Sequence, residues 1–300
     1  MDVWNLHEFR VGLGFGVVAS GALLLTGLAV TLLGRSRPLP LAGFAIAAGG
    51  LLSIADTRPV PNAVVLGVLG IGAAAALSYL PRVSLWYSLA LAVPFAWVIG
   101  FHGGVVTGTW ARALVTVAAS GGAMLVTAFD DAWQDEAPSL TLLAVSALGM
   151  YATVPDTETI GGALGVVLPF LVLGWPLRVA TLSRPGAAAT VAMLVWAGAV
   201  GARGRPASIV GLVVCLGLLA STPAGDALFP RAGTRCRRWS RQSLILAMVT
   251  SHVLLVIAAS RVVGKVSDPA LAAVGGAVVA VGAVCIGARF RSIGMSTSRP

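Results

Sequence analysis

The chain has 300 residues, of which 57% are hydrophobic and only 10% are charged, and its formal net charge is +9. Soluble domains average about 25% charged residues, and the mean hydropathy of this chain is +0.93. Lipid is the solvent that accepts so much apolar helix surface. The composition therefore predicts a polytopic membrane protein and excludes an ordinary soluble domain.

Apolar runs follow one another along the chain, each near the length of about 20 residues that a helix needs to cross a bilayer. We predict an all-α transmembrane bundle of about 11 spans. The predicted spans cover roughly 11–33, 39–55, 62–80, 84–101, 105–128, 138–153, 159–177, 186–202, 206–222, 242–260 and 269–287. The longest polar stretch between spans, about 221–241, is too short to bury a core. Residues 1–300 are therefore expected to form one integral membrane domain without a soluble domain.

The basic residues predict the orientation of this bundle, because Lys and Arg collect in cytoplasmic loops. With the basic loop at about 223–241 placed inside, 13 basic residues lie in inside breaks and 6 in outside breaks. This places the N-terminus outside and the C-terminus inside. Nineteen Arg against one Lys suggest a GC-rich bacterial genome, and therefore a multi-pass protein of a bacterial plasma membrane. The positive charge needs no nucleic-acid partner, because no basic face belongs to a soluble module.

Two ionisable residues fall inside predicted spans, where charge is costly and function is the default hypothesis. Arg112 lies about 10 Å into the fifth span, so it either snorkels to the outer surface or meets a buried partner or an anionic ligand. We expect it to have an acidic neighbour among Asp56, Asp156 and Glu158, which are predicted to lie on the same outer side. His252 is expected to be hydrogen-bonded to a neighbouring helix, with a proton relay as the alternative.

Three aspartates recur on the predicted outer side, after the second, sixth and tenth spans. They are Asp56, Asp156 and Asp268, and each stands just before the next predicted helix. Asp is a favourable N-cap residue, so helix capping accounts for all three. A weak internal repeat, as found in many transporters, is the alternative.

An acidic cluster breaks the basic trend on the predicted inner side. Asp130, Asp131, Asp135 and Glu136 follow the fifth span without a basic residue among them. Paired carboxylates at an inner helix end resemble those of the membrane transferases that load sugar phosphates onto polyprenyl phosphate, and such a pair implies a Mg²⁺–diphosphate site. The chain lacks the later Asp-Gly-x-Asp-Gly segment and His-rich loop of those enzymes, so the family is not assigned.

The two interpretations of this cluster predict different structures. A metal site requires the helix to continue through Glu136, so that Asp131 and Asp135 converge at i and i+4. It also requires a basic group for phosphate, such as Arg82 or Arg178. The alternative is an open turn with all four acids in water.

Small residues indicate how the helices pack. The chain contains 37 glycines, and Gly12 and Gly16 form a GxxxG step in the first span. Such steps let helices approach closely in lipid, either within one chain or between chains. Among the eight tryptophans, Trp110 and Trp196 lie deep in their spans and are expected to pack inside the bundle.

The leading functional hypothesis is a non-enzymatic, transporter-like bundle for a small or lipid-linked solute, without a cofactor. The first alternative is a membrane enzyme that acts on a lipid phosphate through Mg²⁺ at the acidic cluster. The second is a scaffold subunit of an envelope assembly. A transporter predicts a cavity lined by Arg112 or His252, an enzyme predicts an acidic cleft, and a scaffold predicts an apolar groove. The expected partners are membrane lipids and, through a helix–helix contact, another subunit.

Overall fold

The computed structural model describes residues 7–32, 40–81, 83–104, 108–132, 138–174, 177, 179–203, 205 and 208, and, later in the chain, 246, 249–250, 252–254, 256–257 and 260. Within these residues the regular structure is helical throughout. The helices are α1 (His7–Leu32), α2 (Ala42–Ala55), α3 (Asn62–Ala76), the 3-10 turn η2 (Leu77–Tyr79), α4 (Leu85–Ala90), α5 (Val93–His102), α6 (Thr109–Ala132), α7 (Pro138–Thr153), α8 (Thr157–Val167), α9 (Phe170–Leu173) and α10 (Arg184–Gly201).

For the described residues the all-α prediction is confirmed, and the first eight predicted spans overlap these helices. The fourth span is divided between α4 and α5, and the seventh between α8 and α9. The second division falls at Pro169, which has no N–H to continue a helix. Thr141 of α7 donates a hydrogen bond of 3.2 Å to the carbonyl oxygen of Leu171 in α9. The eleventh predicted span, and almost all of the ninth, lie outside the described residues.

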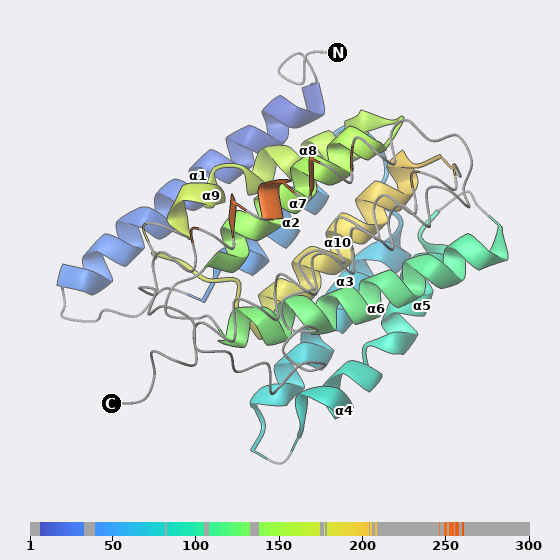
Figure 1. The fold of residues 1–300 in the computed structure, drawn as a ribbon, viewed down its shortest axis with the longest axis horizontal. Helices are drawn as coiled ribbons and strands as arrows, with labels where there is room; N and C mark the ends of the chain where they lie inside the picture. Colours follow the sequence, from blue (N-terminus) through green and yellow to red (C-terminus); the bar gives the residue numbers. More distant parts are fainter. Residues whose placement is uncertain are drawn as a thin grey trace, which may run out of the picture.

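Helix α10 is the centre of the bundle. It packs on α2, α3, α6 and α8, and every residue of α10 is buried except Arg184 and Val200. Figure 1 shows α10 between a layer that contains α1 and α8 and a layer that contains α5 and α6. A helix that is apolar on all sides is expected to be buried in this way.

Consecutive segments run in alternate directions, so their connections gather at two opposite ends. One end holds Arg58, Asp156 and Arg203, which interact with one another; we call it the Arg58 end. The other holds Tyr79 and Arg184, in contact through the Tyr79 ring; we call it the Arg184 end. The connections after the second, sixth and eighth predicted spans lie at the Arg58 end.

The GxxxG step of α1 faces α8 of the same chain. A methyl group on Gly16 would lie 2.6 Å from the carbonyl oxygen of Val166, and one on Gly12 would collide with the carbonyl of Gly162. Both obstacles are backbone atoms, so the two helices approach each other only because these positions are glycine. The sequence left open whether the GxxxG step packs on a helix of the same chain or of another chain. The structure shows that it packs on α8 of the same chain.

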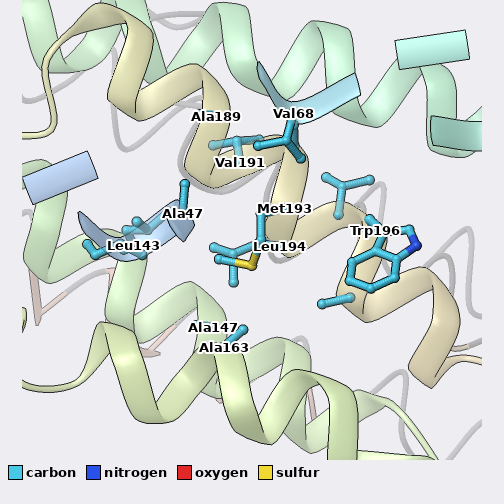
Figure 2. Close-up of a cluster of buried hydrophobic side chains, with 14 of the residues drawn as sticks. Ala47, Val68, Leu143, Ala147, Ala163, Ala189, Val191, Met193, Leu194 and Trp196 are labelled. Atoms are coloured by element: carbon cyan, nitrogen blue, oxygen red, sulfur yellow. The ribbon is translucent and has the colours of Figure 1, made fainter. Parts of the chain in front are cut away.

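The core is built from small and medium-sized apolar side chains around α10. Figure 2 shows Met193, Leu194 and Trp196 of α10 among side chains from the surrounding helices, including Ala47 of α2 and Val68 of α3. Trp196 is buried, as predicted, and its Nε1–H donates a 2.8 Å hydrogen bond to the carbonyl oxygen of Gly103. Trp110 is 54% exposed, so the prediction that it packs inside the bundle was wrong.

Large apolar side chains also cover the outside of the described bundle. Exposed examples occur on α1, α2, α3, α5, α6 and α7, and they include Val18, Leu25, Leu66, Leu69, Val117 and Leu148. By length and composition, two helical stretches of the described chain reach the size of a membrane span, His7–Ala29 and Asn62–Tyr79. Helices α2, α5 and α7 are apolar but shorter.

Candidate functional site

The densest group of charges in the described residues lies at the Arg58 end and is centred on Asp156. The Nε and Nη2 atoms of Arg203 each lie 2.9 Å from Oδ2 of Asp156. Arg58 Nη2 lies 3.7 Å from the same oxygen and 2.9 Å from Oε2 of Glu158. The backbone N–H of Asp156 also donates to the carbonyl of Gly201. These contacts tie the α2–α3 and α7–α8 connections to the end of α10.

Asp156 and Asp56 play different local roles at this end. Asp156 is the N-cap of α8, and its Oδ1 accepts a 3.3 Å hydrogen bond from the N–H of Glu158, which confirms the capping prediction. Asp56 follows the last residue of α2 and does not cap α3, whose N-cap is Pro61, so the capping prediction was wrong for Asp56. Its Oδ2 lies 3.2 Å from His7 Nε2 instead. Asp268 lies outside the described residues.

Arg112 does not join this group of charges. In the part of the chain that the structure describes, the three predicted acidic neighbours pair with His7, Arg58 and Arg203, and Arg112 forms no ion pair. The prediction of an acidic neighbour was therefore wrong. Its side chain is half-buried, and the Nε atom has no hydrogen-bond partner among the described residues. The Arg112 backbone carbonyl accepts a 3.0 Å hydrogen bond from the Thr116 hydroxyl.

His252 is buried against α7. Its Nε2 lies 3.0 Å from the hydroxyl oxygen of Ser146, and both side chains are buried. This is an interhelical hydrogen bond of the kind expected for a lone histidine in an apolar span. This hydrogen bond joins the partly described segment around residue 252 to α7.

Asp130 is also buried, near the Arg184 end. It accepts a hydrogen bond from the hydroxyl of Ser139, at the start of α7. The interpretation in which all four acids of the cluster project into water is therefore wrong for Asp130. The side chains of Asp131, Asp135 and Glu136 lie outside the described residues, as do Arg82 and Arg178. Within the described chain, no group of three or more His, Cys, Asp or Glu side chains is arranged to hold a metal ion.

In the described part of the chain, α2, α3 and α10 form an apolar groove of about 650 Å³. Helices α2 and α3 each pack on α10 but make little direct contact with each other, so α10 is the floor and the other two helices are the walls. Pro185 and Ala189 contribute to the floor, and small residues such as Ala48 and Ala73 contribute to the walls. All the lining residues are apolar. The sequence analysis expected an apolar groove only for a scaffold subunit and did not predict which helices would form it.

A positive charge lies beside one end of the groove, at the Arg184 end. Arg184 immediately precedes Pro185, which lines the groove. Its Nη1 donates hydrogen bonds to the carbonyl and hydroxyl oxygens of Ser78, at 2.9 and 3.3 Å, and its guanidinium carbon lies 5.1 Å from the centre of the Tyr79 ring. The Thr127 hydroxyl donates to its backbone carbonyl. These contacts hold Arg184 between η2 and α6.

No known protein-family model matches the sequence, and no curated protein matches it significantly. The features that bear on function are therefore the groove, the charged groups at the two ends and the apolar exterior.

Proposed function

We propose that the chain is a non-enzymatic, multi-pass protein of a bacterial plasma membrane that binds and handles a lipid or a lipid-linked solute. The proposal keeps the topology of about 11 spans with the N-terminus outside, so the Arg58 end is external and the Arg184 end is cytoplasmic. The apolar exterior of the described helices and their alternating direction support it. Contiguous apolar surface of this extent is unfavourable in water and favourable in lipid.

The groove between α2 and α3 carries the functional part of the proposal. Its volume of about 650 Å³ falls in the range of about 300–1,000 Å³ that small-molecule sites occupy. Its lining offers a ligand no charged side chain, so the part of the ligand that it fits is a hydrocarbon chain. The rim residues Leu52 and Leu69 are exposed, so a chain could enter sideways from the bilayer without crossing a polar surface.

An apolar groove without Arg112 or His252 in its lining is the feature expected for a scaffold subunit, and the exposure of its rim residues Leu52 and Leu69 is what favours a lipid chain as its occupant. Neither Arg112 nor His252 lines the groove, so the groove does not offer the polar path that a small hydrophilic solute needs. An enzyme would use the acidic cluster, where Asp130 is engaged by Ser139. A scaffold subunit would place a partner's helix in the same groove, and the experiment below distinguishes that occupant from a lipid.

The experiment measures the lipid that stays with the purified protein. Ala48 is an exposed wall residue of the groove, so Ala48→Trp fills the groove without disturbing the buried core. Ala22→Trp, on the exposed face of α1, is the matched control. After extensive detergent washing, native mass spectrometry should find a lipid adduct on the wild type and on Ala22→Trp, but not on Ala48→Trp.

Two results would reject the lipid-binding proposal. One is an equal lipid adduct on Ala48→Trp and on the wild type, which would place the lipid elsewhere. The other is a stoichiometric polypeptide that is lost only from Ala48→Trp, which would identify the groove as a subunit interface.

A further inference from the structure

We infer that Arg112 binds a phosphate group at the Arg58 end, on the side of the bundle formed by α5 and α6. This site is separate from the apolar groove and does not depend on what occupies the groove. The phosphate belongs either to a phospholipid headgroup or to an inorganic anion from solution, and the experiment below separates these two sources. Three observations carry the inference: the side chain of Arg112, its position in α6, and the arrangement of the acids around it.

The first observation is that the Arg112 guanidinium has no partner among the described residues. Its side chain is half-buried, and its Nε atom is buried without a hydrogen-bond acceptor. By contrast, the side chains of Arg58, Arg184 and Arg203 all contact described partners. A partly buried charge is costly when it is unpaired. Because the charge is delocalised over the guanidinium nitrogens, an oxyanion that reaches the Nη atoms would compensate for it.

The second observation is the position of Arg112 in the first turn of α6. The α5–α6 connection lies at the Arg58 end, because a methyl group on Gly104 would lie 3.6 Å from the ring of Pro61, the N-cap of α3. The first turn of a 24-residue helix attracts negative charge through the aligned peptide dipoles. Trp110, two residues earlier, is 54% exposed, and tryptophan is enriched at the headgroup level of membranes. A phosphate can therefore reach Arg112 without entering the apolar core.

The third observation is that the acids around this position are paired or distant. At the Arg58 end, Asp156 pairs with Arg203, Glu158 with Arg58, and Asp56 with His7. Helix α6 packs chiefly on α5 and α10, and neither of those helices contains an acid. The acids of α6 itself are Asp130 and Asp131, which lie at least 18 residues further along the helix, or about 27 Å away. No described carboxylate therefore competes with a phosphate for Arg112.

The test measures the melting temperature of the full-length protein in a non-ionic detergent without phosphate. Inorganic phosphate is titrated at an ionic strength that chloride keeps constant. In a second titration, dihexanoylphosphatidylglycerol is compared with dihexanoylglycerol, which lacks the phosphate. A ligand that binds the folded state raises the melting temperature with its concentration. The wild type should respond to a ligand that carries phosphate, and Arg112→Gln should weaken its apparent affinity by about tenfold or more, because charged hydrogen bonds are lost.

Two variants serve as controls. Arg205 is an exposed arginine that follows α10 at the same end, so Arg205→Gln changes the net charge equally and should respond as the wild type does. Ala48→Trp fills the groove and should also keep the response to phosphate. A lost lipid adduct in Ala48→Trp thus reports on the proposed function alone, whereas a lost phosphate response in Arg112→Gln reports on this inference alone.

The two sources of the phosphate give different responses. A response to dihexanoylphosphatidylglycerol without one to inorganic phosphate would support the inference and identify a lipid headgroup. A response to inorganic phosphate at similar concentrations would support it and identify an anion from solution.

Four results would overturn the inference. One is a wild type that responds equally to both lipids and not to inorganic phosphate. The second is an unchanged response in Arg112→Gln, and the third is an equal loss in Arg205→Gln. The fourth is coupling of melting temperatures between Arg112→Gln and either Asp2→Asn or Asp268→Asn, since it would identify a carboxylate partner outside the described residues. If Arg112→Gln does not elute as a folded protein, the apolar variant Arg112→Met takes its place and the wild-type titrations still decide.

Discussion

The charged cluster at the Arg58 end makes a quantitative prediction about Asp156. Its side chain is only 5% exposed, whereas that of its partner Arg203 is 65% exposed. Asp156→Ala removes an N-cap, worth about 1 kcal/mol, and hydrogen bonds to charged groups, worth about 1.5–3 kcal/mol. Water replaces part of the second contribution, because Arg203 is exposed. We therefore expect Asp156→Ala to lower the free energy of unfolding by about 2–3 kcal/mol. Asp156→Asn should lower it by about 1–2 kcal/mol, because Asn also caps helices well.

Asp56→Asn is the matched control at the same end of the bundle. The Asp56 and His7 side chains are 51% and 63% exposed, and exposed ion pairs contribute about 0–1 kcal/mol. Apparent melting temperatures in detergent would measure the difference. At roughly 2–4 °C per kcal/mol, Asp156→Ala should lower the melting temperature by about 4–12 °C and Asp56→Asn by less than about 4 °C.

A double-mutant cycle tests the reasoning behind this prediction. Asp156→Asn and Arg203→Gln should couple by at least about 0.5 kcal/mol, because the two side chains are in direct contact. Additive effects, or equal losses for Asp156→Asn and Asp56→Asn, would refute the argument that burial of Asp156 sets the strength of the cluster.

Three further predictions concern packing and topology. Gly16→Ala should destabilise the protein by about 1–3 kcal/mol, because its methyl group would lie 2.6 Å from the Val166 carbonyl oxygen. Gly14→Ala should be neutral or stabilising, because nothing lies within 4 Å of its methyl position. Equal melting temperatures for the two variants would contradict the packing of α1 on α8. Trp196→Phe removes the hydrogen bond to Gly103 and should cost about 1–3 kcal/mol, while Trp110→Phe should have little effect in the same melting assay. Reporter fusions after Pro300 and within 223–241 should both read cytoplasmic, and an external signal at either site would reject the proposed orientation.

Most of the described helices were predictable because each corresponds to a continuous apolar run in the sequence, although two of the predicted runs are divided into two helices. The bounds of α7, Pro138–Thr153, coincide with the predicted span 138–153. Local chemistry explains where prediction became less accurate. Asp56 and Asp156 are both followed by threonine, but Pro59 and Pro61 delay the start of α3, so only Asp156 caps a helix. The sequence contains both the Asp-Thr capping signal and the prolines, and at Asp56 the prolines prevent the capping.

Features that depend on distant residues could not be read from the sequence. Arg58 and Glu158 are 100 positions apart, and hydropathy does not specify which helices meet. The burial of Asp130 depends on the hydroxyl of Ser139, and the exposure of Trp110 depends on which face of α6 is covered. The groove arises because α2 and α3 both pack on α10 but diverge from each other. Small residues such as Ala48 and Ala73 leave the space between them unfilled.

The most direct test of the central claim is a cryo-electron microscopy map of the full-length protein in lipid nanodiscs. The account predicts a membrane-embedded bundle with a continuous, chain-shaped density in the groove between α2 and α3, running along α2 from Phe44 towards Ala55. A groove that is empty or filled by a polypeptide helix would contradict the lipid-binding claim. A bundle that lies outside the nanodisc would contradict the membrane placement.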